Sequence, residues 1–181
     1  MMNGINHIIK QSNSKNIRIG IIFILLVNLV IFPFFSTDFV NSSTILDLHF
    51  GFSTDDVLNN LRLMHDSGRH LYLLTSLLID TPYAIAYGFI YAIIIAALIK
   101  RKITTTNQYL IGIPFFISFF DLLENSGIVY FILHYPHIPP VVTQFVSIFN
   151  QLKWVFAGIT LVLIVILLIK NLMTKLTQNN K

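Results

Sequence analysis

Two carboxylic acids and an amide interrupt an otherwise apolar segment, Ser118-Phe-Phe-Asp121-Leu-Leu-Glu124-Asn125-Ser-Gly127. The segment lies in an apolar run, residues 109–134, that is long enough to cross a lipid bilayer as a helix. A charged residue at the centre of a membrane helix costs roughly 2.5 to 3.5 kcal/mol on insertion scales. Asp121 and Glu124 therefore need partners inside the membrane, and buried acids of this kind are candidates for a functional site.

The composition is that of a polytopic membrane protein. Of the 181 residues, 55% are hydrophobic and 11% are charged, which excludes an ordinary soluble domain. The length accommodates about four helical spans and one loop, so we expect a single membrane domain over residues 1–181. No cysteine is present, which excludes disulfides and thiolate metal sites. The net charge of +4 comes from basic residues at the ends of apolar runs, which indicates membrane topology and not nucleic-acid binding.

Four apolar runs predict an all-α, polytopic four-helix membrane bundle. The expected spans cover about residues 17–35, 71–99, 109–134 and 141–169. We interpret the first run as an uncleaved span and not as a signal peptide, because no small-residue cleavage pattern follows it. Residues 1–16 are polar and are expected to form a short tail. The second run is longer than a bilayer requires, and we expect Pro82 to kink it.

The first loop, residues 36–70, is expected to contain a short amphipathic helix. Ser53-Thr-Asp-Asp56 has the form of a capping box at a helix N-terminus. Apolar residues then recur on one helical face, and Gly68 is expected to end the helix: Val57, Leu58, Leu61 and Met64 form that face. We expect this helix to lie as a lid on the outer surface of the bundle or in the headgroup layer.

Basic residues predict the orientation of the chain. Nine of the twelve lie at the N-terminus, between the second and third spans, and at the C-terminus: Lys10, Lys15, Arg18, Lys100, Arg101, Lys102, Lys170, Lys175 and Lys181. Four spans place these three regions on one side of the membrane, and the positive-inside rule assigns that side to the cytoplasm. We therefore expect a multi-pass protein of the cell membrane with both termini cytoplasmic and loop 36–70 outside.

The predicted topology brings polar residues of three spans to a similar depth. The predicted buried polar cluster consists of Asp80, Asp121, Glu124, Asn125 and Lys153. Helical spacing places further polar and aromatic residues beside it: Tyr83, Tyr87, Asn150, Gln151 and Trp154. Arg69, at the start of the second span, is a candidate contact for an anionic headgroup, with a helix cap and turn as the alternative.

Three interpretations of the cluster are open. Lys153 can pair with the acids and clasp three helices together. Because three acids face one lysine, one acid can instead be left to hold a proton or a cation, as in transport. The cluster can also form a pocket for an amphipathic, lipid-like ligand, walled by tyrosines and Trp154.

We therefore expect a ligand-binding or ion-binding bundle that supports transport. The alternatives are an intramembrane enzyme acting on a lipid, with Glu124 or Asp121 as acid or base, and a structural subunit of a membrane assembly. The expected partners are the bilayer and a lipid-like ligand, a proton or a cation, and four spans are also compatible with a homodimer. No cofactor is expected, and no metal site is expected because the histidines lack a metal-ligand spacing.

Several motifs carry a resemblance. They are Leu46-Asp47-Leu-His-Phe-Gly51-Phe-Ser53, Asp56-Val57, Ser67-Gly68-Arg69-His-Leu-Tyr72, Asp80-x-Pro82-Tyr83, Asp121-Leu-Leu-Glu124-Asn125 and Leu152-Lys153-Trp154. Over about residues 46–154 the chain resembles an uncharacterised group of small bacterial four-span integral membrane proteins with an Asp, Asp-x-x-Glu-Asn and Lys pattern. The resemblance implies the architecture and the choice of site residues, and no activity. The layout is also loosely similar to the sterol-isomerase-like membrane fold, which warrants no function.

Overall fold

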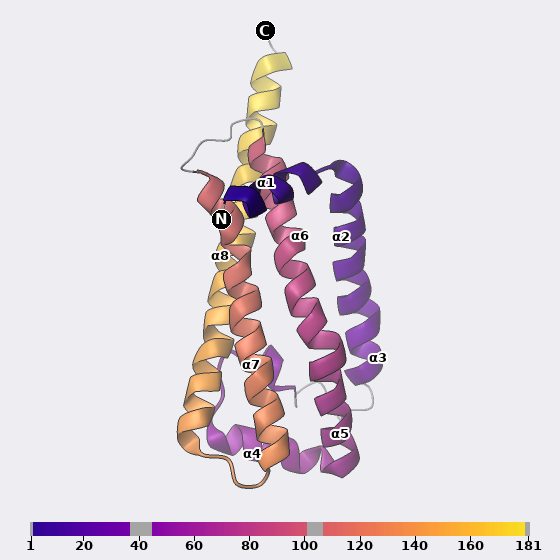
Figure 1. The fold of residues 1–181 in the computed structure, drawn as a ribbon, viewed down its shortest axis with the longest axis vertical. Coiled ribbons are helices and arrows are strands. Elements are labelled where there is room, and N and C mark those ends of the chain that lie inside the picture. The colour runs from indigo at the N-terminus through magenta and orange to yellow at the C-terminus, as the bar shows by residue number, and fades with distance from the viewer. Residues whose placement is uncertain (1, 37–44, 101–106, 180–181) are drawn as a thin grey trace.

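The computed structural model describes residues 2–36, 45–100 and 107–179, and most of those residues are helical, with no β-strand among them. Four helical stretches in these ranges are long and apolar enough to cross a membrane: Ser14–Phe34, His65–Ile99, Asn107–His134 and Pro140–Gln178. Figure 1 shows them running along one another as a bundle. The predicted all-α four-helix membrane bundle is therefore confirmed.

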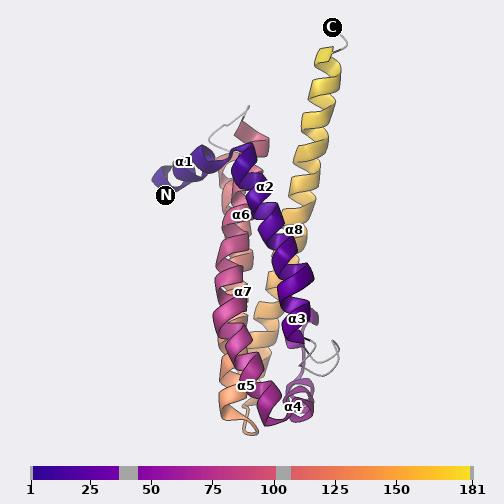
Figure 2. The ribbon, with the colours of Figure 1, turned by 90° about the vertical axis from the view of Figure 1, so that its right-hand side faces the viewer.

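The N-terminal region was expected to be a polar tail, and this expectation is wrong. Residues Met2–Gln11 form helix α1. Three isoleucines on its apolar face pack against a buried cluster of α6 (Thr81–Ile99): they are Ile5, Ile8 and Ile9. Asn6 and His7 separate Ile5 from Ile8, and burial of one helical face stabilises the helix despite the polar composition. In Figures 1 and 2 both termini lie at the end of the bundle opposite α4 (Thr54–Leu63).

The first span lies along α6 at the edge of the bundle. It consists of α2 (Ser14–Leu26), a π-helical turn (Val27–Ile31) and α3 (Phe32–Ser36). Large apolar side chains such as Ile22 and Leu29 are exposed on its far side, as a lipid-facing surface requires. The amide Nδ2 of Asn28 donates to the Tyr83 hydroxyl, which ties the span to α6.

The lid helix α4 begins as predicted and ends earlier than predicted. Ser53 is its N-cap and forms a capping box with Asp56. Gly68 does not end the helix. The chain instead turns at Met64 and at His65, whose φ is +54°, and Gly68 lies buried inside the next helix, α5 (His65–Thr75). An added Cβ at Gly68 would approach Met64 Cβ to 3.1 Å. Glycine therefore allows close packing at this position and does not end the helix.

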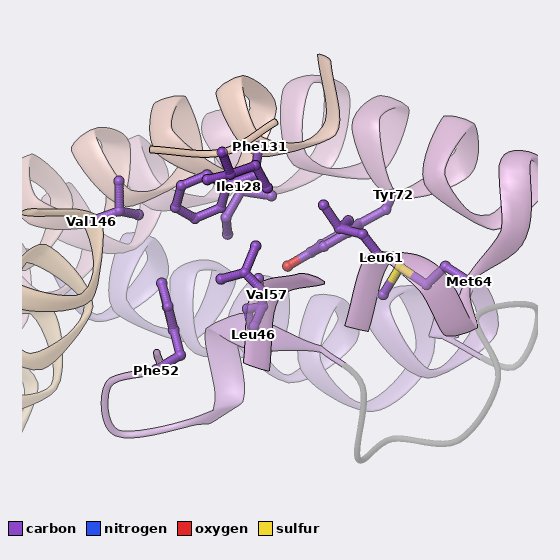
Figure 3. Packing of buried hydrophobic residues seen from close by; sticks show 10 residues of the cluster. Leu46, Phe52, Val57, Leu61, Met64, Tyr72, Ile128, Phe131 and Val146 are labelled. Atoms are coloured by element: carbon purple, nitrogen blue, oxygen red, sulfur yellow. The ribbon is translucent and has the colours of Figure 1, made fainter. Parts of the chain in front are cut away.

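A hydrophobic core holds the lid against the bundle. Val57 and Leu61 of α4 are fully buried with Phe131 and Ile128 of α7 (Pro114–His134), and Figure 3 shows these side chains pointing toward one another. Phe52 packs edge-on against Phe131, with ring centroids 6.1 Å apart. The lid therefore closes one end of the bundle, which we call the lid end.

The lid helix cap predicts a local pH dependence. Asp56 accepts hydrogen bonds from the Ser53 amide at 2.8 Å and the Ser53 hydroxyl at 2.7 Å. These bonds, the backbone one first, hold the pKa of Asp56 below its ordinary value of 3.8. Because the folded pKa is the lower one, the contribution to stability is complete above the unfolded pKa and is lost as pH falls through the folded pKa.

We expect the amides of Asp56 and Val57 to lose protection from hydrogen exchange in that acid range. At neutral pH, Ser53→Ala should cost about 1 kcal/mol of local stability, because one amide at the helix start loses its acceptor. Hydrogen exchange of the two proteins measures both effects. Unchanged protection in Ser53→Ala at neutral pH would contradict the role of the cap.

The second span contains a break just before Pro82. A π-helical turn, Ser76–Asp80, separates α5 from α6, and Pro82 lies in the first turn of α6. Proline lacks the amide hydrogen that would continue the regular pattern. In the turn before it, the Ser76 carbonyl accepts both the Thr81 amide and, at 2.8 Å, the Thr81 hydroxyl. The irregularity therefore lies one turn before the proline and sets the position of Asp80.

The other two spans approach their neighbours closely. A short 3-10 stretch, Asn107–Gly112, precedes α7. Gly88 of α6 faces Ser118 of α7, whose hydroxyl donates to the Ala84 carbonyl at 2.6 Å. Helix α8 (Pro140–Asn179) packs along α7, and Figures 1 and 2 show its C-terminal part extending past the other helices.

Candidate functional site

Lys153 is the centre of the buried cluster. Its Nζ lies 2.5 Å from Glu124 Oε2, 3.3 Å from Asp121 Oδ1 and 3.9 Å from Asp47 Oδ1. Lys153 and Asp121 are almost completely buried and Glu124 is fully buried. Ion pairs in so apolar a setting persist only with good geometry and further hydrogen bonds.

Neutral polar groups donate further hydrogen bonds to the two acids of α7. The Asn150 amide donates to Glu124 Oε1 at 2.8 Å, and the Tyr87 hydroxyl donates to Asp121 Oδ2 at 2.6 Å. The three helices α6, α7 and α8 therefore meet at these two carboxylates. The helical spacing that predicted this arrangement places all of these side chains toward the centre of the bundle.

Asp47 is a member of the cluster that the sequence analysis did not assign to the site. It lies in a short 3-10 turn, Leu46–Leu48, of the segment that precedes the lid helix. Its Oδ2 accepts from the Tyr72 hydroxyl at 2.9 Å, and its carbonyl accepts from the Trp154 indole at 3.3 Å. The first loop therefore reaches into the bundle and brings a third carboxylate to Lys153.

The loop is held in place by polar residues of α8. The Gly51 amide donates to Asn150 Oδ1 at 2.7 Å, and the Phe52 amide donates to the Ser147 hydroxyl at 2.9 Å. Gly51 has φ +82°, and a Cβ there would collide with the Gln151 amide, so only glycine is suited to this turn. Polar residues at successive turns of α8 were the available signal that something other than lipid covers this face.

Asp80 lies beside the cluster without joining its ion pairs. In the part of the chain that the structure describes, no Lys, Arg or His nitrogen lies within 4.0 Å of its carboxylate. Asn125 approaches it from α7 without a hydrogen bond of ordinary geometry.

A cavity of about 690 Å³ adjoins the cluster. It lies between the first span and α8, and the remaining wall comes from the first loop, from α5 with the π-helical turn after it, and from α6 and α7. Three charged cluster residues and Asp80 line it: they are Asp47, Asp80, Asp121 and Lys153. Aromatic side chains cover much of the rest, namely Tyr72, Tyr83, Tyr87, Tyr91 and Trp154. Glu124 is absent from this lining and lies behind Lys153.

The remaining predicted residues have different surroundings. Gln151 faces the Gly51 turn, and the Lys153 ammonium lies 5.7 Å from the centroid of the Trp154 ring. Arg69 is not brought to the cluster. It pairs with Asp66, donates to the Leu61 carbonyl at 2.6 Å and lies over the Tyr135 ring, so it ties α5 to the lid.

Metal binding receives no support from the geometry. Among residues 2–36, 45–100 and 107–179, no group of three His, Cys, Asp or Glu side chains is arranged to hold a metal ion.

Comparison of the chain with protein-family models, curated proteins and solved structures finds no match. The chemistry of the site therefore has to be inferred from its four carboxylates, its single lysine and the adjoining cavity.

Proposed function

We propose that this integral membrane protein binds a small amphipathic ligand in the cavity beside the cluster and supports transport of that ligand. The cavity itself is the main support for the proposal. Its volume lies within the roughly 300–1,000 Å³ typical of small-molecule sites. Charged groups line it on the side of Asp47 and Lys153, and apolar groups such as Leu161 and Ile164 line it further along α8.

Binding is better supported than catalysis. Glu124 is fully buried, bonded to Lys153 and Asn150, and absent from the cavity lining. Asp121 lines the cavity, but Lys153 and the Tyr87 hydroxyl already occupy its oxygens. A general acid or base has to exchange a proton with its substrate, and both carboxylates are held by protein donors instead.

The ion pairs also support a structural role for Lys153. It joins α8 to α7 through Asp121 and Glu124 and to the first loop through Asp47. This clasp is compatible with ligand binding, because it fixes the wall of the cavity that Lys153 and Asp121 share.

Filling the cavity should abolish ligand binding. Gly158 lines the cavity, and nothing lies within 4 Å of a Cβ placed there, so Gly158→Phe should fold while occupying the ligand volume. Trp154, the only tryptophan, also lines the cavity and can transfer excitation energy to a bound diphenylhexatriene dye. We expect saturable transfer to at least one of three such dyes, with a cationic, an anionic or an uncharged end group.

In Gly158→Phe this saturable component should fall at least tenfold in affinity, while dye dissolved in lipid leaves a linear background. Val162→Phe, on the exposed face of the same helix, is the matched control and should bind as wild type does. If none of the dyes shows a saturable component in wild type, or if Gly158→Phe binds as wild type does, the proposed function is wrong.

We further propose that the protein lies in the cell membrane with both termini in the cytoplasm. The support is the distribution of Lys and Arg along the chain. Because the chain has no cysteine, single cysteines can report the orientation. A maleimide that cannot cross membranes should label His137→Cys in intact cells and should label Thr177→Cys only after permeabilisation. The reverse labelling pattern would show that both termini lie outside the cell and that the proposed orientation is wrong.

A further inference from the structure

We propose that the ligand of the cavity is an organic cation, an ammonium group on an apolar body, and that Asp80 is its counter-ion. The inference rests on the proposed function, since it names the chemical class of the ligand for the same cavity. It follows from the charges, the free polar groups and the aromatic wall of that cavity.

The charges around the cavity do not balance within the described residues. Lys153 is the one basic side chain in the cluster, and it is shared by Asp47, Asp121 and Glu124. Asp80 lines the cavity and has no basic partner in the described ranges. Asp80 is only partly exposed, and an unpaired charge there is costly, so a ligand cation supplies the missing charge without moving Lys153.

Two further polar groups in the cavity wall lack partners. Thr75 and Thr160 both line the cavity and are 8% and 2% exposed. Their hydroxyl oxygens have no hydrogen-bond partner among the residues that the structure describes. Buried hydroxyls are normally satisfied, so these two indicate a polar occupant that completes them, either ligand N–H groups or water carried with the ligand.

The aromatic wall favours a cation over a neutral polar molecule. The rings of Tyr83 and Tyr87 have centroids 5.2 Å apart, and those of Tyr87 and Tyr91 are 6.0 Å apart, so three tyrosines follow one another along α6. All three line the cavity. Aromatic faces attract ammonium groups, and the attraction grows when water is excluded.

The far part of the cavity suits an apolar body. Going along α8 from Lys153, the lining becomes mostly apolar, and Ile117 of α7 faces the same space. The α8 residues of this part are Ala157, Gly158, Leu161 and Ile164, with Thr160 as the polar residue among them. An inorganic cation would leave this volume unused, and the described residues offer it no metal-like arrangement of ligands. We therefore place the charged group near Asp80 and the apolar body toward Ile164.

The experiment compares two dyes that differ by one trimethylammonium group. The probes are diphenylhexatriene and its trimethylammonium derivative, added to the full chain in lipid nanodiscs, with energy transfer from Trp154 as the signal. We expect the cationic dye to bind at least tenfold more tightly than the uncharged one. Asp80→Asn should remove this preference, because it should lower the affinity for the cationic dye at least tenfold and leave the affinity for the uncharged dye unchanged.

Binding of the uncharged dye also shows that Asp80→Asn is folded, and Asp80→Glu should restore part of the preference. Asp55→Asn, an exposed acid of the lid, is the matched control and should behave as wild type does. Equal saturable binding of both dyes, or an unchanged preference in Asp80→Asn, would overturn the cation assignment and leave the ligand cavity standing. An Asp80 that holds only a proton would give this second result.

Discussion

Lys153→Met should cost about 3–5 kcal/mol of stability, because it removes the one positive charge shared by three carboxylates, of which those of Asp121 and Glu124 are buried. Asp47, Asp121 and Glu124 all lie within 4 Å of the Lys153 ammonium, and the lysine is 8% exposed. Methionine keeps most of the side-chain volume, so the loss of stability comes from the removed charge and not from a new cavity. Unfolding in mixed micelles, titrated with a denaturing detergent, measures the difference.

The matched control is Lys170→Met on the same helix. Lys170 is exposed and lies near the end of the membrane-spanning stretch, so its replacement should change stability by less than about 0.5 kcal/mol. A stability of Lys153→Met equal to that of the control would show that the ion pairs do not hold the bundle together.

A second substitution separates charge repulsion from lost packing. Glu124→Gln keeps the shape of the side chain and its acceptor for the Asn150 amide while removing one buried charge. Combined with Lys153→Met, it should recover part of the lost stability, since one fewer carboxylate lacks a counter-charge. Strictly additive losses in the double variant would indicate that the two side chains act independently.

The depth of the cluster could be predicted because the spans have a fixed geometry. A helix rises 1.5 Å per residue, so counting from the ends of the apolar runs places Asp121 and Lys153 at a similar level. Helical spacing then places Asn150 on the same face as Lys153, and the structure shows Asn150 bonded to Glu124. Within a regular helix, the spacing of two residues in the sequence fixes their relative depth and the face on which they lie. Most of the predicted fold rests on this relation.

Residue spacing does not fix the position of a side chain in a loop, which is why Asp47 was not assigned to the site. Its position depends on the turn at Gly51 and on hydrogen bonds to Asn150 and Ser147, which are contacts between distant parts of the chain. Gly68 was misread for a related reason. A glycine is typical of helix ends, but it also allows close packing inside a helix, and only the neighbouring Met64 distinguishes the two uses.

The cavity also depends on tertiary placement. Its volume is set by how far the first span stands from α8, and the sequence of that span contains few polar residues that fix the distance. The bond between Asn28 and Tyr83 attaches the span to α6. Asn28 lines the cavity together with Asp80, so the first span contributes a polar residue to the wall of the site.

Phe131→Ala should cost about 3–5 kcal/mol and loosen the lid end first. Phe131 is fully buried where α7 meets the lid, in one core with Val57 and Leu61 and edge-on to Phe52. Truncating a buried aromatic ring removes its burial and leaves a space that the surrounding helices fill only in part. Phe119→Ala on the exposed face of the same helix is the control and should cost less than about 1 kcal/mol.

The position of Phe131 predicts where the damage appears. Phe52 loses its aromatic partner, and the Phe52 and Gly51 amides are the groups that fasten the first loop to Ser147 and Asn150. Hydrogen exchange should therefore accelerate at these two amides and in α4 more than at the centre of α7. Because Asp47 lies on the same loop, a loosened lid should also weaken its contact with Lys153. Uniform acceleration across the bundle would mean that the lid has no stability of its own and unfolds only with the spans.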